Sequence, residues 1–345
     1  MYDMMQKRSD SLIIKKRSVN YNYIGLQTLY NRLPNEHIMK SMIYSKMLSV
    51  KAGIIGETIV ENIFKKYQFP FNYRVLHDVN LTSNGKFQMD TIFISSSCLF
   101  ILESKNIVGE LSFETDPPYL VRTLENGQKD MFESPEVQLE RNIYLMKEWL
   151  KLHEINLPVK GVIIISSTKS RVVRTPNNTN VIYASSIPVF LRNMQPEKEY
   201  LTVTQMDYLA QKIVHEHQPY LAYPMCKNWG IIPTDLVTGV QCGNCSKFGM
   251  LRVKRTWLCP ECSNRDANGH TYSIIDWFVL IGGQLSNSEC RRFLHIHQHQ
   301  TVTRILHGME LIVVGSGKLT KYEMSQKMQY GIKDFYLDRK TSIQL

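Results

Sequence analysis

Residues 87–105 constrain the fold of this chain more strongly than any other stretch. They form two apolar segments, rich in β-branched and aromatic residues, on either side of a serine cluster. This pattern predicts a β-hairpin or two neighbouring strands. Charged residues interrupt both segments, with Asp90 in the first and Glu103 and Lys105 at the end of the second. Because strand side chains alternate between faces, we expect Glu103 and Lys105 on one face of an otherwise apolar sheet.

Two carboxylates and an ammonium in this arrangement suit metal-assisted hydrolysis of a phosphodiester. Asp90 and Glu103 offer the hard oxygen ligands that Mg²⁺ prefers, and the backbone carbonyl of Ser104 supplies a further oxygen. A bound ion lowers the pKa of an attacking water, and Lys105 holds or deprotonates that water. The alternative is an ion pair between Glu103 and Lys105 at a strand end, with a solvated Asp90. These residues alone give both interpretations about equal weight.

The order and spacing of several short motifs resemble a known family. Gln88-x-Asp90, followed by an apolar strand that ends in Glu103-x-Lys105, is similar to the NERD (nuclease-related) domain of the PD-(D/E)xK nuclease superfamily. The resemblance spans roughly Lys51 to Ser167 and includes Gly53-Ile-Ile-Gly56-Glu57, Gly109 and Ser134-Pro135-Glu-Val-Gln138. The chain departs from the family at Ser134, where asparagine is usual, and at Ser104, where valine or a similar residue is usual.

The resemblance implies an α/β fold, a restriction-endonuclease-like sandwich with a central mixed sheet. It also implies a nuclease that depends on Mg²⁺ or Mn²⁺, with active-site positions Glu57, Asp90, Glu103, Lys105 and Gln138. In this assignment Asp90 and Glu103 bind the metal. Glu57 orients a ligand or binds a second ion, and Gln138 contacts the water or the phosphate.

The segment before residue 87 predicts a long helix and a weakly ordered start of the chain. A helical pattern begins near Asn35, and apolar residues between Ile54 and Tyr67 recur at three- and four-residue intervals. Gly53 and Gly56 lower helix propensity, so we expect both to allow close packing against a neighbour. Residues 2–33 lack periodicity, which favours a partly ordered, solvated terminus over an arm lying on the nuclease domain or on nucleic acid.

Four of the seven cysteines form two C-x-x-C pairs, Cys242/Cys245 and Cys259/Cys262, with thirteen residues between the pairs. Two such knuckles close a tetrahedral Zn²⁺ site on a β-hairpin. Four thiolates leave no open position, so we expect a structural zinc. Two redox dithiols are the weaker alternative, because neither pair has the strand-to-helix context of a thioredoxin-like site. The cysteines do not form a disulfide framework, which predicts a cytoplasmic location.

The stretch after these cysteines resembles a winged helix-turn-helix. It has three helical segments, 271–281, 288–296 and 300–308, and then two short strands around a glycine turn within 309–324. In such domains the third helix and the wing face DNA, and a basic hairpin such as that between the cysteine pairs suits phosphate contacts. The expected nucleic-acid-binding residues are Lys254, Arg255, Thr301, Arg304, Lys318 and Lys321. Small winged helices also serve in dimerisation and protein docking, so both uses stay open.

The charge balance supports a polyanionic partner. The 345 residues include 41 Lys+Arg against 31 Asp+Glu, a formal net charge of +10. This excess favours nucleic acid over an anionic membrane, and the wing favours DNA over RNA. The longest aliphatic runs, such as Val162 to Ile165, are far too short to span a membrane, and no signal-peptide core is present, so no membrane association is expected.

The sequence therefore predicts a metal-dependent nuclease that acts on DNA. Two alternatives stay open: a non-catalytic nucleic-acid-binding protein that keeps the nuclease fold as a platform, and a protein-interaction adaptor. A binder tolerates loss of the carboxylates, whereas an adaptor shows little salt-dependent affinity for DNA. The expected organisation is an N-terminal arm (1–34), the nuclease-like domain (35–217), a linker (218–240), a zinc ribbon (241–268), a winged-helix-like domain (269–330) and a C-terminal tail (331–345).

Overall fold

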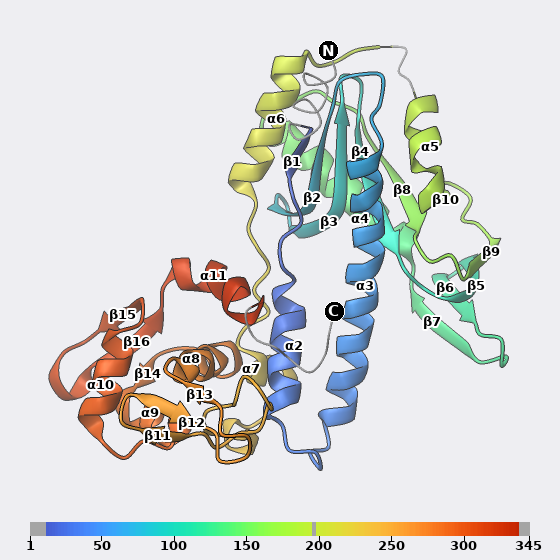
Figure 1. Cartoon of the computed structure of the whole chain (residues 1–345). Helices are drawn as coiled ribbons and strands as arrows, with labels where there is room; N and C mark the ends of the chain where they lie inside the picture. Colours follow the sequence, from blue (N-terminus) through green and yellow to red (C-terminus); the bar gives the residue numbers. More distant parts are fainter. Residues whose placement is uncertain (1–11, 195–197, 338–345) are drawn as a thin grey trace. The chain divides into compact units, whose positions relative to one another are not determined.

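The computed structural model describes residues 12–194 and 198–337, which form two compact units (Figure 1). The first unit contains the described residues up to Ser18 together with Val50–Tyr220. The second contains Val19–Ser49 and the described residues from Leu221 onwards. The chain therefore passes from one unit to the other three times.

These units divide the chain differently from the expected domains. The predicted linker, which begins at residue 218, lies close to the last passage, but the predicted arm, 1–34, is shared between the two units. The beginning of that arm, residues 1–11, and the end of the predicted tail, residues 338–345, lie outside the described residues.

The first unit is built on a six-stranded mixed sheet. Its strands are β1 (Ile13–Lys15), β2 (Tyr73–Thr82), β3 (Lys86–Ser95), β4 (Leu99–Lys105), β8 (Val159–Ile165) and β10 (Asn180–Tyr183). They lie side by side in the order β1-β2-β3-β4-β8-β10. The pairs β2–β3 and β3–β4 are antiparallel, and the other three are parallel. The strongly apolar β8 lies inside the sheet, as expected for a strand that helices bury on both faces.

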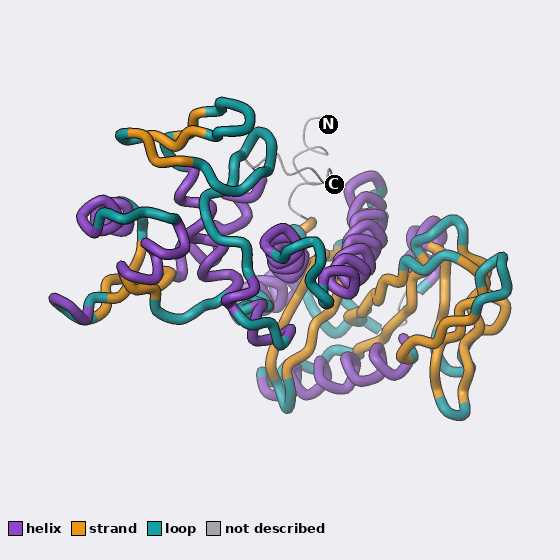
Figure 2. Tube along the Cα trace, turned by 90° about the horizontal axis from the view of Figure 1, so that it is seen from below, coloured by secondary structure: helices purple, strands orange, loops and turns teal. Residues whose placement is uncertain are grey.

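Helices cover both faces of this sheet, and the α/β class is confirmed. They are α3 (Lys40–Lys66), of which the part from Val50 belongs to this unit, α4 (Pro135–Leu152), α5 (Ile187–Asn193), which follows the 3-10 turn Ala184–Ser186, and α6 (Val203–Glu216). The apolar residues of α4 and α6 share one core with one face of the sheet, and those of α3 and α5 share a second core with the other face. Figure 2 shows the orange strands between purple helices.

A second, four-stranded sheet follows β4 along the chain. Its strands are β5 (Gly109–Thr115), β6 (Pro118–Thr123), β7 (Lys129–Glu133) and β9 (Ser170–Arg174). They are ordered β7-β6-β5-β9, with β5 antiparallel to β6 and parallel to β9. The buried side chains of β5 and β6 join the core shared by α4 and α6, so this sheet belongs to the same folded unit.

The regular alternation of buried side chains is interrupted where β2 and β3 carry aspartates. On β3, Met89 and Ile92 both face the core of α4 and α6, although a regular strand would place them on opposite faces. On β2 the same interruption occurs at Asp78, which has a left-handed backbone with φ of 51°. Asp78 and Asp90 both lie between the cross-strand pairs His77–Thr91 and Val79–Met89. Asp90 therefore lies at a local irregularity within β3.

The two helical glycines of α3 differ in their surroundings. A Cβ atom on Gly56 would lie 2.6 Å from Asn106 Cβ and 2.6 Å from Ser166 Oγ, so only glycine allows this approach of α3 to the sheet. A Cβ atom on Gly53 would meet nothing within 4 Å. The prediction of close packing is therefore confirmed for Gly56 and wrong for Gly53.

The prediction of a weakly ordered, solvated start is wrong for residues 12–33. Strand β1 pairs in parallel with β2, with Ile13 opposite Val75 and Lys15 opposite Leu76. The Nζ atom of Lys15 donates to the carbonyl oxygens of His77 at 2.9 Å and of Asp78 at 2.6 Å. The sequence missed this strand because three residues are too few to show a period of two.

The second unit begins with helix α2 (Tyr21–Arg32), whose last residue anchors it. The side chain of Arg32 is fully buried, and its Nε donates to Asp276 Oδ2 at 2.8 Å. Its guanidinium also donates to the carbonyl oxygen of Val237 at 2.9 Å and lies over the rings of Phe248 and Phe293. A buried arginine needs such partners, so α2 is an integral part of this unit.

The rest of the second unit combines a small cysteine-bearing sheet with a helical module. Its elements are α7 (Met225–Trp229), the 3-10 turns Pro233–Asp235 and Gly317–Leu319, β11 (Leu251–Val253), β12 (Thr256–Leu258), β13 (Arg265–Asp266), α8 (Gly269–Leu280), β14 (Leu285–Ser286), α9 (Asn287–Leu294), α10 (His299–His307), β15 (Leu311–Val314), β16 (Lys321–Met324) and α11 (Gln326–Leu337). Two three-stranded sheets form, ordered β11-β12-β13 and β14-β16-β15.

One core joins these two parts of the second unit. Trp257 on β12 is buried together with Ile274 and Phe278 of α8, and its Nε1 donates to His270 Nδ1 at 3.1 Å. The expected boundary at residue 268 therefore falls inside a shared core. Trp257 does not contribute to the exposed surface of the basic hairpin between the cysteine pairs, because its side chain is 1% exposed.

Candidate functional site

Glu103, Lys105 and Gln138 meet at the carboxyl end of β4. The Nζ atom of Lys105 donates to Glu103 Oε1 at 2.8 Å and to Gln138 Oε1 at 2.8 Å. Glu103 and Lys105 share the face of the sheet that α4 covers, as strand alternation predicts. Gln138 comes from the first turn of α4, which begins at Pro135 after the N-cap Ser134.

Asp90 reaches the same strand from β3. Its Oδ2 accepts a hydrogen bond of 2.8 Å from the backbone N–H of Ser104. The regular β3–β4 ladder ends at the pair Thr91–Leu102, so a side chain, and not a backbone carbonyl, satisfies this N–H. The irregularity of β3 thus directs the Asp90 carboxylate to the residue between Glu103 and Lys105.

Burial raises the pKa of both carboxyl groups, those of Asp90 and Glu103. Burial and the neighbouring Asp90 raise the pKa of Glu103 to about 7, although Lys105 acts in the opposite direction. Burial likewise raises the pKa of Asp90. Burial alone would lower the pKa of Lys105, but Glu103 and Asp90 outweigh it, so the pKa of Lys105 is raised. Lys105 therefore carries its proton at neutral pH.

The donor set fits a hard divalent cation. Glu103 is 2% exposed, and its Oε2 has no hydrogen-bond partner within residues 12–194 and 198–337. An unpartnered buried carboxylate oxygen is costly, and a cation would satisfy it. Asp90 and Glu103 offer carboxylate oxygens, which are the ligands that Mg²⁺ and Mn²⁺ take in proteins.

Glu57 makes its contacts with an arginine that the sequence did not single out. Arg17 donates through Nη1 to the Glu57 carboxylate and through Nη2 to the Glu57 carbonyl oxygen at 2.9 Å. The Arg17 Nε lies 3.5 Å from Glu61 Oε2. No local pattern could have identified Arg17, because it lies 40 positions before Glu57 in the chain.

Asn142 is a second residue that sequence reasoning missed. It lies one helical turn after Gln138 and is 1% exposed. Its Nδ2 donates to the backbone carbonyl of Gln88 at 2.8 Å, which fixes α4 against β3 two residues before Asp90. The available signal was a polar residue among the regularly spaced apolar residues that follow Pro135.

Comparison with known proteins adds one finding to this geometry. Residues 52–166 match the family model of the nuclease-related domain, NERD. The match covers less than half of the chain. It contains Glu57, Asp90, Glu103, Lys105 and Gln138, whereas Arg17 lies outside it. No curated protein and no solved structure matches the chain significantly.

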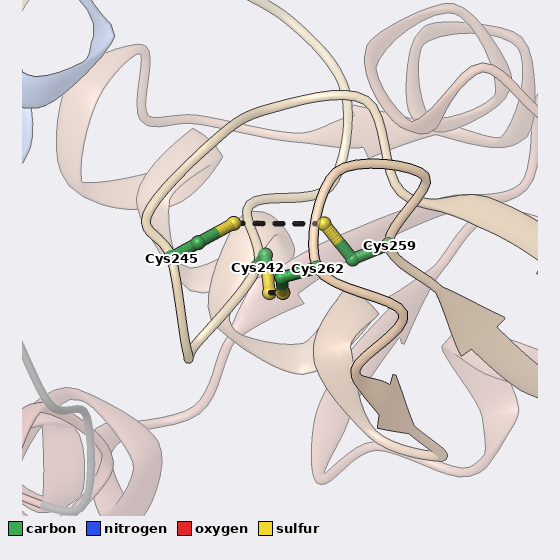
Figure 3. Close-up of side chains that lie close together, drawn as sticks. All are labelled: Cys242, Cys245, Cys259 and Cys262. Carbon is green, nitrogen blue, oxygen red and sulfur yellow. Dashed lines mark hydrogen bonds between the residues drawn. The ribbon is translucent and has the colours of Figure 1, made fainter.

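Outside the NERD match, the four paired cysteines converge. Their sulfur atoms all lie within 4.8 Å of one another, close enough for one metal ion (Figure 3). The Cys242 and Cys262 sulfurs are 3.6 Å apart, and so are those of Cys245 and Cys259. The Asn244 side chain donates to Cys262 Sγ, which helps lower the pKa of Cys262 to about 6. In the same cluster the pKa of Cys245 is raised to about 12, so without a metal ion the thiols share protons among themselves.

The expected nucleic-acid-binding residues of the second unit lie mostly at its surface. Lys254 and Arg255 form the exposed turn between β11 and β12, and Lys254 has a left-handed backbone. Arg304 on α10 and Lys318 and Lys321 on the β15–β16 hairpin are also exposed, whereas Thr301 is half-buried. None of the helices within the described ranges combines the length and hydropathy of a membrane span.

Proposed function

We propose that this chain is a metal-dependent nuclease that hydrolyses phosphodiester bonds, in DNA in preference to RNA. The observation that carries the proposal is the unpartnered, buried Oε2 of Glu103 beside Asp90, Lys105 and Gln138. The NERD match supports the same activity, because it contains all of these residues.

Asp90 and Glu103 would hold Mg²⁺ or Mn²⁺, with the backbone carbonyl of Ser104 as a further ligand. When bound, the ion would lower the pKa of a water and offset charge on the scissile phosphate. The Asp90 carboxylate is kept in place by the Ser104 N–H, so it needs little reorganisation before it binds a cation.

Lys105 would act as a hydrogen-bond donor. Its raised pKa keeps it protonated, so it can hold the attacking water and stabilise negative charge that develops on the phosphate. Gln138 accepts from Lys105 at 2.8 Å, which leaves its amide NH₂ to contact the water or a phosphate oxygen. Glu57 would orient a ligand or bind a second ion.

The second unit would place the nuclease on DNA. The order helix, strand, helix, helix, strand, strand from α8 to β16 supports a winged-helix-like module. Its exposed Arg304, Lys318 and Lys321, with Lys254, Arg255 and Thr301, would contact the phosphate backbone. The cysteine cluster would bind a structural zinc.

The test is cleavage of supercoiled DNA, single-stranded DNA and RNA with Mg²⁺ or Mn²⁺ against a chelator. We compare wild type, Asp90→Asn and Lys105→Ala, with Lys147→Ala as an exposed lysine on α4. The proposal requires metal-dependent cutting that both site variants lose while they keep DNA affinity. Tight binding without cutting by any protein would support a non-catalytic binding platform. Little salt-dependent affinity for DNA would support an adaptor.

A further inference from the structure

Arg17 places a permanent positive charge beside Glu57 and Glu61 of α3. Its side chain is 11% exposed and contacts the carboxylate and the backbone carbonyl of Glu57. Glu61 Oε2 lies 3.5 Å from its Nε, and the negative charges of Asp90, Glu61 and Asp78 oppose the effect of burial on the pKa of Arg17. Burial lowers the pKa of Arg17, but a guanidinium keeps its proton in proteins, so the charge persists.

The strand before Arg17 holds it firmly. β1 is hydrogen-bonded to β2, and Lys15 is tied to the two carbonyl oxygens at the irregularity of β2. Arg17 lies two residues beyond the end of β1, so the paired strand limits where its backbone can lie. The planar guanidinium of Arg17 can therefore pair with a carboxylate at a small cost in side-chain conformational entropy.

The contact with Glu57 bears on how many cations the site takes. Two-metal sites hold their ions about 3.5–4 Å apart and need carboxylates to balance both. In the proposed function Glu57 is the carboxylate that could bind a second ion, and this carboxylate is already paired with Arg17. A second divalent cation would have to displace the guanidinium or bind beside it, against like-charge repulsion.

We propose that Arg17 is a positioning residue that occupies the place of a second divalent cation, so that this site binds one ion. The inference rests on the proposed function and chooses between the two roles given above for Glu57. Glu57 then orients a ligand and does not bind metal. Because Arg17 precedes the NERD match, the segment before the matched domain completes the site.

The test counts Mn²⁺ ions on the zinc-loaded, full-length chain by electron paramagnetic resonance. Mn²⁺ prefers oxygen ligands, so the thiolate cluster does not add to the count. We expect one ion on wild type, lost in Asp90→Asn. Arg17→Met, which removes the charge and keeps an unbranched side chain, should bind two ions. The added ion should be lost again in the Arg17→Met/Glu57→Gln double variant.

Lys16→Met is the matched control, since Lys16 is an exposed cation one residue away, and it should bind one ion. Two ions on wild type, or one ion on a folded Arg17→Met, would overturn the inference. If Arg17→Met does not fold, Glu57→Gln decides. One ion with an affinity within about threefold of wild type agrees with the proposal, and a larger loss overturns it. Absence of any ion that depends on Asp90 would instead contradict the proposed nuclease function itself.

Discussion

The carboxylate of Asp90 and the backbone N–H of Ser104 are joined by a hydrogen bond of 2.8 Å. This contact ties β3 to β4 just beyond the last regular pair of the ladder, Thr91–Leu102. It brings the carboxylate beside the strand that carries Glu103 and Lys105. The same side chain therefore has a structural role, as an acceptor, and a proposed metal-binding role, as a charge, and substitutions can separate the two.

Asp90→Asn should separate these roles. Asparagine keeps an oxygen that can accept from Ser104 but loses the negative charge, so the fold should persist while Mn²⁺ affinity falls by about 100-fold or more. Asp90→Ala loses the hydrogen bond as well and should cost about 1 kcal/mol of unfolding free energy more than Asp90→Asn. Calorimetry of Mn²⁺ binding and urea unfolding measure the two effects. Equal Mn²⁺ affinity of Asp90→Asn and wild type would remove Asp90 from the metal site.

Metal binding should depend on pH near neutrality. Burial raises the pKa of Glu103 to about 7, so its carboxyl is mostly protonated at lower pH and must lose that proton to bind a cation. Mn²⁺ affinity should therefore rise about tenfold from pH 6 to pH 8 and change little above that. Binding titrations at several pH values check this, with Glu103→Gln as the control that has no such proton to lose. An affinity that is constant over this range would contradict the assignment.

The two glycines of α3 should respond oppositely to alanine. Gly56→Ala places a methyl 2.6 Å from Asn106 Cβ and Ser166 Oγ and should lower the unfolding free energy by about 1–3 kcal/mol. Gly53→Ala meets nothing within 4 Å and should raise it by about 0.5–1 kcal/mol through helix propensity. Urea unfolding of the two variants in parallel makes the comparison. A Gly56→Ala protein as stable as Gly53→Ala would mean that α3 does not approach the sheet this closely.

Loss of one paired cysteine should release the zinc and loosen the second unit locally. Cys242→Ser removes a thiolate whose residue also lies in the shared core, so zinc content should fall from one ion per chain towards none. Hydrogen exchange in residues 240–268 should become at least about tenfold faster. Cys290→Ala is the matched control, because Cys290 is buried in the same core but lies outside the cluster. Full zinc content in Cys242→Ser would show that the four thiolates do not form one site.

Much of the sheet follows from local patterns. The apolar segments around the serine turn form β3 and β4, and alternation places Glu103 and Lys105 on one face. The recurrence of apolar residues at three- and four-residue intervals likewise locates α3. These features depend on residues a few positions apart, which is the range over which a sequence pattern carries information.

The remaining features depend on contacts between distant residues. Arg17 meets Glu57 across 40 positions, and Arg32 meets Asp276 across 244. The break in side-chain alternation at Asp78 and Asp90 requires β2 and β3 to be irregular at the same cross-strand position. The sequence of either strand alone does not indicate it. The residues next to Trp257 in the sequence are typical of an exposed hairpin, but its side chain packs against α8. No local pattern could reveal that contact.

The three passages of the chain between its two units make the first unit discontinuous in sequence. A fragment cut to the NERD match, residues 52–166, would lack Arg17 and β1. It would also lack α6, whose Met206, Leu209 and Ile213 complete the core on one face of the sheet. Cutting the chain at the ends of the match thus removes structural support on both sides and, on the N-terminal side, the cation that contacts Glu57, so the first unit needs residues from both sides of the match.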